Sequence, residues 1–267
     1  QTIPVFGEKD KNVNRQIELI KQASTNGNSL IVLPELGNTG YIFNNRNELE
    51  ELAEEIPNGP TCQKWLSICQ EEKVYLCAGI AERDKGKYYD SAVLIGPGGF
   101  IGKYRKTHLW DEDKLWFEPG DLGFPIFDLQ FGRVGILICY DGWKPEVPRI
   151  LALQGADIIC DPAAWVFVPG VITLENSLSP YIHLAHAHMN NIFMVCSVRA
   201  GEERGCTFLG NSCIAGPSGF IAGPASVNKE EIVSAEINLS QSRYKHWSEM
   251  ASVLTDRRVD LYDELLG

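Results

Sequence analysis

The sequence predicts a mixed α/β fold for this chain of 267 residues, and three observations support it. Short apolar runs typical of buried strands alternate with amphipathic stretches of helical periodicity. Many neighbouring strands are separated only by a tight turn, such as Pro97-Gly98-Gly99, so antiparallel pairs must accompany any parallel ones. No linker rich in glycine, serine or proline divides the chain, and we therefore expect one domain over residues 1–267.

Two helices are predicted in the first half of the chain. The stretch 12–22 carries its apolar residues on or near one face, and 61–72 follows a proline turn with Thr61 as its N-cap. Strands are predicted from apolar runs bounded by turn residues, at 29–33, 74–81, 91–96, 100–104, 125–129 and 133–139.

Two further helices are predicted in the second half. The first covers 148–154 and ends at Gly155, because glycine readily adopts the left-handed conformation that ends helices. The second covers 176–190 and carries three histidines. Strands are predicted at 157–160, 192–198, 211–215, 219–222 and 231–237.

Charge and cysteine content exclude several classes of function. The formal net charge of −11 repels phosphate backbones, so we expect no nucleic-acid partner. Apolar runs such as 134–139 are far shorter than the roughly 20 residues of a bilayer-spanning helix, so we expect no membrane segment. The eight cysteines form no Cys-x-x-Cys pair, and several lie in apolar runs as small hydrophobes. These features predict a reduced, cytoplasmic protein.

Cys139 is the candidate nucleophile. It ends the apolar run 134–139, and 144–146 then opens a helix. A side chain at a strand-to-helix turn is held stiffly, and the N–H group that follows it, here that of Tyr140, can stabilise an oxyanion. A helix N-terminus would also favour the thiolate. The same pattern fits a buried structural cysteine.

Glu35 and a basic segment supply the other candidate groups. Glu35 ends a buried strand, and burial raises a carboxyl pKa toward the range that suits a proton shuttle. Lys103, Arg105 and Lys106 end another strand, and one inward-pointing cation could stabilise developing negative charge. The local pattern does not distinguish among these three, and both segments also fit solvated surface charges.

Together the three segments resemble the nitrilase superfamily of carbon–nitrogen hydrolases. The motifs occur in the family's order, as Pro34-Glu35, Tyr104-Arg105-Lys106-Thr107-His108-Leu109 and Gly135-Ile136-Leu137-Ile138-Cys139-Tyr140-Asp141. Further stretches are also similar to the family, at 161–165, 213–219 and 257–262. The resemblance covers nearly the whole chain.

The resemblance implies a four-layer α-β-β-α sandwich that forms a homodimer or a higher homo-oligomer. It also implies a catalytic triad in which Glu35 is the acid/base, Lys106 stabilises the oxyanion and Cys139 is the nucleophile. Many members have a second glutamate six residues before the proline of a Pro-Gly pair. Asp113 holds that place here, with Glu112 beside it as the alternative.

The chain also differs from the family in the predicted helix 176–190. Relatives often have an Arg-Ala-x-Glu-Asn pattern where this chain has His186-Ala187-His188-Met189-Asn190. His183, His186 and His188 together suggest a metal cluster, but the resemblance implies neither a metal nor a cofactor. We therefore expect structural histidines.

The residues after the nucleophile indicate the substrate class. Family nitrilases usually continue with Trp-Glu, whereas Tyr140-Asp141 follows here, as in amidase and carbamoyl-amide branches. We therefore expect hydrolysis of a small-molecule amide to an acid and ammonia or an amine, through a thioester. An N-carbamoyl hydrolase, a nitrilase and a non-catalytic binding protein on this fold remain alternatives. The candidate pocket aromatics, which equally suit core packing, are Tyr41, Phe43, Trp143 and Trp165.

Overall fold

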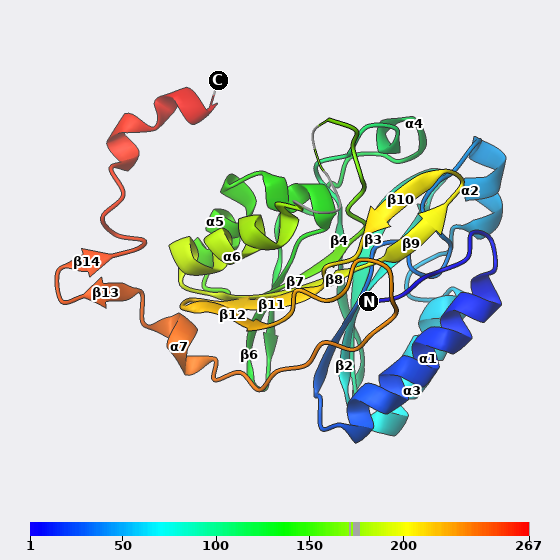
Figure 1. The fold of residues 1–267 in the computed structure, drawn as a ribbon, viewed down its shortest axis with the longest axis horizontal. Coiled ribbons are helices and arrows are strands. Elements are labelled where there is room, and N and C mark those ends of the chain that lie inside the picture. The colour runs from blue at the N-terminus through cyan, green and yellow to red at the C-terminus, as the bar shows by residue number, and fades with distance from the viewer. Residues whose placement is uncertain (171, 173–176, 267) are drawn as a thin grey trace.

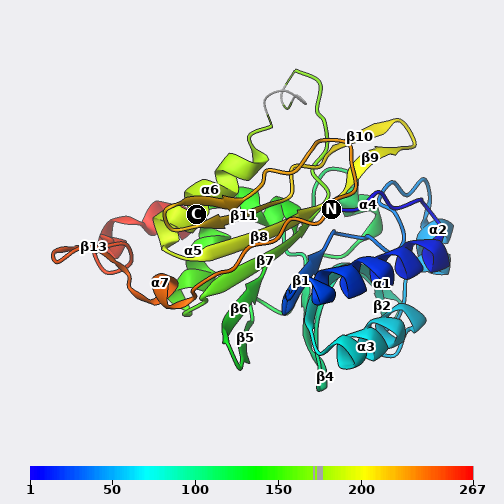
Figure 2. The ribbon, with the colours of Figure 1, turned by 60° about the horizontal axis from the view of Figure 1, so that its bottom comes forward.

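Two β-sheets face each other at the centre of the molecule, with helices on both outer sides (Figures 1 and 2). The computed structural model describes residues 1–170, 172 and 177–266. The first sheet has the order β1–β2–β3–β4. In it β1 and β2 run parallel and the other pairs antiparallel. Its strands are β1 Leu30–Leu33, β2 Tyr75–Asp84, β3 Lys87–Gly96 and β4 Gly99–Arg105.

The second sheet has the order β12–β11–β8–β7–β6–β5. The pairs β6–β7 and β7–β8 are parallel, so the carboxyl ends of these three strands meet at one edge of the sheet. Ligand and catalytic residues commonly lie at such an edge. The strands are β5 Ile126–Leu129, β6 Gly132–Ile136, β7 Ile158–Ala163, β8 Phe193–Val198, β11 Cys213–Gly216 and β12 Gly219–Ala222.

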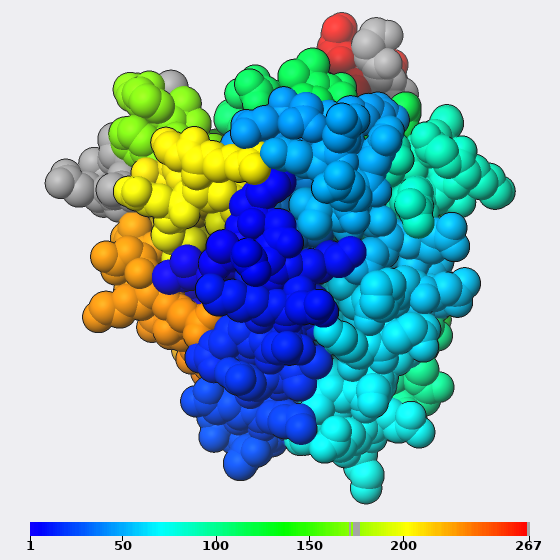
Figure 3. All heavy atoms as spheres, turned by 90° about the vertical axis from the view of Figure 1, so that its right-hand side faces the viewer, coloured from blue at the N-terminus to red at the C-terminus, as the bar shows by residue number. Residues whose placement is uncertain are grey.

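The helices form the two outer layers. α1 (Lys9–Thr25) and α3 (Pro60–Glu72) lie side by side over the first sheet, as Figure 3 shows. α5 (Glu146–Leu153) and α6 (Ser179–Asn190) cover the second sheet. Since each sheet is covered on both faces, its central strands are almost fully apolar, as the sequence suggested. The predicted α-β-β-α sandwich is confirmed.

Several predicted boundaries need correction. Thr61 is not the N-cap of α3, because Gly59 caps the helix and Pro60 is its first residue. The Thr61 N–H and hydroxyl both donate to the Glu54 carboxylate at 2.8 Å. The late helix begins at Ser179, and residue 176, where it was expected to start, lies outside the described residues.

Two strand predictions also change. The strand predicted over 133–139 ends at Ile136, because the chain turns into a short 3₁₀ helix, η1 (Cys139–Trp143). The strand predicted over 231–237 is wrong, and the described backbone there is irregular. In this segment the Glu231 N–H bonds the Gln1 carbonyl at 3.2 Å without starting a ladder.

The remaining elements are short. They are α2 Arg46–Leu52, α4 Asp113–Trp116, α7 Ser240–Arg243, the hairpin β9 Ala200–Glu203 and β10 Cys206–Leu209, the pair β13 His246–Ser248 and β14 Ala251–Ser252, and two terminal 3₁₀ turns, η2 Val259–Leu261 and η3 Asp263–Leu266. The chain after α7 runs away from the sheets (Figure 1). Among the described residues, no helix has the length and apolar character needed to cross a membrane. All eight cysteines lie in the described part and are free thiols.

Candidate active site

Glu35 lies two residues beyond the end of β1 and is completely buried. Its backbone packs directly against Gly79 of β2, where an added Cβ would lie 2.5 Å from the Glu35 Cα. Any larger residue at that position would displace the carboxylate, which explains a glycine within an apolar strand. Glu35 Oε1 accepts a hydrogen bond from Lys106 Nζ at 2.6 Å. Its Oε2 has no hydrogen-bond partner among the described residues.

Lys106 is the cation that points inward. Its Nζ is fully buried and donates to Asp113 Oδ2 at 2.7 Å as well as to Glu35. Burial lowers the pKa of this amine, but the charges of Asp113 and Glu35 outweigh burial and raise the pKa well above its ordinary value. Lys106 is therefore a permanent ammonium ion.

The other two cations of the basic segment point elsewhere. Lys103 and Arg105 lie two residues apart on β4, so they share one face of the strand, and both contact Glu82. Arg105 also bonds Asp84 at 2.7 Å. The structure thus separates Lys106 from its two neighbours, a choice that the sequence pattern left open.

Asp90 of β3 is a third carboxylate beside Lys106. Its Oδ2 lies 3.3 Å from Lys106 Nζ, and the side chain is buried without a hydrogen-bond partner among the described residues. Burial and the charge of Glu35 raise the pKa of Asp90 well above its ordinary value. Three buried carboxyl groups, those of Glu35, Asp113 and Asp90, therefore surround the Lys106 ammonium ion.

Asp113, and not Glu112, lies against Lys106. Asp113 begins α4 and is 5% exposed, whereas Glu112 is exposed to solvent. Asp113 Oδ1 accepts the Tyr41 hydroxyl at 2.8 Å. Tyr41 thus fixes the Asp113 carboxylate, which in turn contacts Lys106. The aspartate side chain is long enough for this contact, so a glutamate is not needed here.

Cys139 begins the turn η1 with a left-handed backbone, φ 49°. Non-glycine residues rarely adopt this conformation, and it occurs often at functional sites. The Cys139 N–H donates to Asp161 Oδ1 at 2.7 Å. Burial raises the pKa of the thiol well above its ordinary value, the Glu35 charge raises it further and Lys106 opposes them. Burial and the Glu35 charge therefore act against the thiolate, which a helix N-terminus was expected to favour.

Asp141 joins the basic segment to the turn η1. It is buried and accepts the Tyr104 hydroxyl at 2.8 Å, the His108 N–H at 2.9 Å and the Ile138 N–H at 3.1 Å. These bonds fix the chain on either side of Lys106 and Cys139. The sequence pattern did not single out Asp90 or Asp161, although a carboxylate inside an apolar strand is a detectable signal.

The candidate aromatics are mostly core residues. Phe43 and Trp165 are 2% and 3% exposed, and Trp165 packs against the His183 ring with the ring centres 4.9 Å apart. Trp143 is half-buried at the end of η1. Their proposed role in substrate binding stays a prediction.

The three histidines have different surroundings. His183 Nε2 lies 2.6 Å from Asp161 Oδ2, and His186 Nε2 lies 2.9 Å from the Gly142 carbonyl oxygen. His188 is exposed and contacts the Pro217 carbonyl. One atom each of Asp161, His183 and Cys196 could contact a cation. However, His183 Nε2 and Asp161 Oδ2 already contact each other at 2.6 Å, so these two groups are paired without a cation.

The lowered pKa of His186 predicts that the free energy of unfolding depends on pH. Burial and the charge of His183 lower its pKa from 6.5 to about 4, so the folded state keeps it neutral. A depressed pKa stabilises the fold above pH 6.5, and this contribution, at most about 3 kcal/mol, is lost as the pH falls through 4. We expect His186→Gln, whose amide N–H can still reach the Gly142 carbonyl, to lessen the fall in unfolding free energy between pH 6.5 and 4. Urea unfolding at each pH measures it, and identical slopes in both proteins would contradict the assignment.

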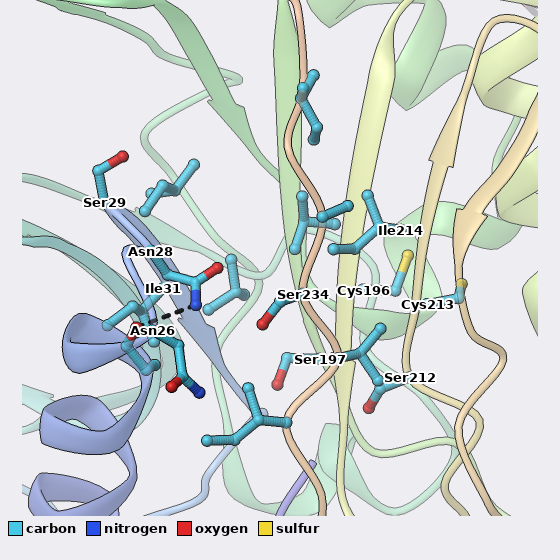
Figure 4. Close-up of a pocket in the computed structure, with 18 of the residues that line it drawn as sticks. Asn26, Asn28, Ser29, Ile31, Cys196, Ser197, Ser212, Cys213, Ile214 and Ser234 are labelled. Carbon is cyan, nitrogen blue, oxygen red and sulfur yellow. Dashed lines mark hydrogen bonds between the residues drawn. The ribbon is translucent and has the colours of Figure 1, made fainter.

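A large hollow of the described structure lies away from this cluster. It has a volume of about 780 Å³ between β1, β8 and the segment 231–239. Figure 4 shows Cys196, Ser197, Ser212, Cys213 and Ser234 around it. Glu35, Lys106 and Cys139 do not line this hollow. The candidate site is the cluster of Glu35, Lys106 and Cys139, which follow β1 and β4 of the first sheet and β6 of the second.

The chain is similar to several known proteins. The family model described as carbon-nitrogen hydrolase matches residues 1–244. A protein of Pyrococcus abyssi named nitrilase is 44% identical over 98% of this chain and 97% of its own. An N-carbamoylputrescine amidase of Arabidopsis thaliana is 32% identical over 96% of this chain and 90% of its own. The crystal structure of a carbon-nitrogen hydrolase from Helicobacter pylori G27 covers 99% of this chain and 96% of its own, with 32% identity and a TM-score of 0.88. The chain belongs to the carbon–nitrogen hydrolase family.

Proposed function

We propose that this protein hydrolyses a small amide through a thioester on Cys139. The observation that carries the proposal is the buried contact of 2.6 Å between Glu35 and Lys106, beside a thiol whose pKa responds to both charges. Three chain segments, near residues 35, 106 and 139, meet there. A carboxylate, a fixed cation and a sulfur nucleophile are the groups that acyl transfer requires.

The proposed reaction begins with proton transfer. Glu35 accepts the thiol proton as the Cys139 sulfur attacks the carbonyl carbon of the amide. Negative charge then grows on the carbonyl oxygen, where the Lys106 ammonium and the Tyr140 N–H stabilise it. The contact of Lys106 Nζ with Asp90, at 3.3 Å, is longer than its contacts with Glu35 and Asp113, so the third Lys106 N–H can turn to the oxyanion.

Collapse of the oxyanion breaks the carbon–nitrogen bond. Glu35 returns its proton to the leaving nitrogen, and ammonia or an amine departs. A water molecule then loses a proton to Glu35 and attacks the thioester carbon. The carboxylic acid leaves, and the thiol takes the proton back. Asp113 and Tyr41 hold Lys106 in place during both halves of the reaction.

Two relatives favour second candidates. The 44% identical relative is named a nitrilase, and the plant relative is named an N-carbamoylputrescine amidase. The same three groups could serve either reaction. Tyr140-Asp141 after the nucleophile supports the amide.

A substrate panel separates the three reactions. We expect the protein to release ammonia faster from short aliphatic amides than from nitriles of the same chain length. N-carbamoyl amines would release carbon dioxide together with ammonia, so both gases are measured. Hydrolysis of nitriles without hydrolysis of amides would overturn the amide proposal in favour of a nitrilase. No ammonia from any class would oppose the enzyme proposal itself.

We also propose that one domain spans the chain and that the protein is a homo-oligomer, as the resemblance implies. Exposed apolar side chains on the C-terminal segment support association, and they include Tyr244, Trp247 and Met250.

A further inference from the structure

Two buried histidines of α6 face the nucleophile turn, and the proposed reaction uses neither of them. His183 is fully buried and lies between a backbone carbonyl and a carboxylate. Its Nδ1 lies 2.7 Å from the Ser179 oxygen, and its Nε2 lies 2.6 Å from Asp161 Oδ2. The other Asp161 oxygen accepts the Cys139 N–H at 2.7 Å. A continuous chain of contacts therefore runs from α6 through Asp161 to the nucleophile.

The hydrogen positions follow from the partners. The Ser179 carbonyl can only accept, so His183 Nδ1 carries a hydrogen. The contact between Nε2 and the Asp161 carboxyl then holds one proton between them. Burial lowers the pKa of His183, but Asp161 outweighs burial and the pKa is raised. Burial raises the pKa of Asp161 to about 6, and His183 opposes that rise.

His183 also packs against the other end of the turn η1. A Cβ added at Gly142 would lie 2.7 Å from His183 Nε2, so the turn can approach the ring this closely only with a glycine there. His186 Nε2 meets the Gly142 carbonyl at 2.9 Å. The turn η1 is thus held at its first residue by Asp161 and at its fourth by α6. This support maintains the left-handed backbone of Cys139.

We propose that Asp161 and His183 form a positioning pair for Cys139: His183 orients the Asp161 carboxylate, and Asp161 holds the Cys139 N–H so that the sulfur faces Glu35 and Lys106. The inference rests on the proposed role of Cys139 as nucleophile. Asp161 and His183 act through the backbone of the turn and are positioning residues.

The test measures alkylation of Cys139 by iodoacetamide, with the modified residue identified by peptide mass spectrometry. This readout needs no known substrate. Removal of the Asp161 charge by itself favours the thiolate, so two uncharged variants are compared. Asp161→Asn keeps an oxygen for the Cys139 N–H, whereas Asp161→Ala does not. We expect Asp161→Asn to react at least as fast as the wild type, and Asp161→Ala to react at least about tenfold more slowly than Asp161→Asn.

A second matched pair addresses the histidine. The glutamine amide in His183→Gln can place an N–H where histidine has Nε2, whereas the shorter side chain of His183→Asn cannot reach Asp161. We expect glutamine to retain most of the wild-type rate and asparagine to lose at least about tenfold. His188→Gln, on the exposed face of the same helix, is the control and should react like the wild type.

The outcomes distinguish the two proposals. If wild-type Cys139 reacts no faster than the half-buried Cys206, the nucleophile proposal fails. If wild-type Cys139 reacts fast, and Asp161→Ala and His183→Asn react equally fast, the positioning pair is overturned while the nucleophile stands. General unfolding of a variant would instead speed alkylation of all eight cysteines, which is also contrary to the inference.

Discussion

Replacement of Cys139 by alanine is expected to lower amide turnover by about 10⁴-fold or more. The remaining groups can still bind a substrate and polarise its carbonyl, but no sulfur is present to form the thioester. The thiol is a small side chain and its loss leaves a small gap, so the free energy of unfolding should change by less than about 2 kcal/mol. Ammonia release and urea unfolding measure the two effects.

The control and the direct observation of the intermediate complete this test. Cys206→Ala removes a half-buried thiol on the β9–β10 hairpin and should leave turnover unchanged. Intact mass after acid quenching should show the acyl group on the wild-type protein and none on Cys139→Ala. Turnover near the wild-type rate in Cys139→Ala would rule out the proposed chemistry.

Replacement of Lys106 by methionine is expected to damage both stability and turnover. The variant leaves the Glu35 and Asp113 carboxylates buried without their cation. Loss of one partner from a buried ion pair typically costs about 3–5 kcal/mol, because the remaining charge has neither water nor a counter-ion. Loss of an oxyanion donor also lowers turnover by about 10²–10³-fold. Urea unfolding and ammonia release measure the two losses.

Two further variants separate charge from packing. Lys106→Met combined with Asp113→Asn removes one uncompensated carboxylate, and it should recover part of the lost stability without recovering turnover. Lys103→Met is the matched control on the same segment, because Arg105 still neutralises Glu82 there. We expect it to cost about 1 kcal/mol. Equal stability of Lys106→Met and Lys103→Met would contradict the buried ion cluster.

The predicted strands agree with the structure where the strand is buried on both faces and its residues are therefore apolar. Prediction failed where the residues of a segment do not reflect burial. The central strands are covered on both faces, so the runs near Leu76, Ile136 and Ile159 are apolar and easily recognised. The hairpin β9–β10 contains Gly201, Glu202 and Glu203, and these residues interrupt the apolar pattern by which strands are recognised. The segment 231–237 shows the opposite error, because it has strand-like residues without a described ladder partner.

Apolar patterning predicted the mixed α/β architecture, and the ordered motifs predicted the family and the three segments that carry Glu35, the basic cluster and Cys139. The inward direction of Lys106, its contact with Asp113 and not Glu112, and the contacts of Asp161 with Cys139 and His183 are visible only in the folded protein. This division arises because apolar periodicity is a local property of the chain, set in each segment by the burial of its own face. The direction and charge state of a polar side chain depend on partners tens of residues away. Those partners meet only when the ends of β1 and β4 in the first sheet come together with the turn after β6 in the second.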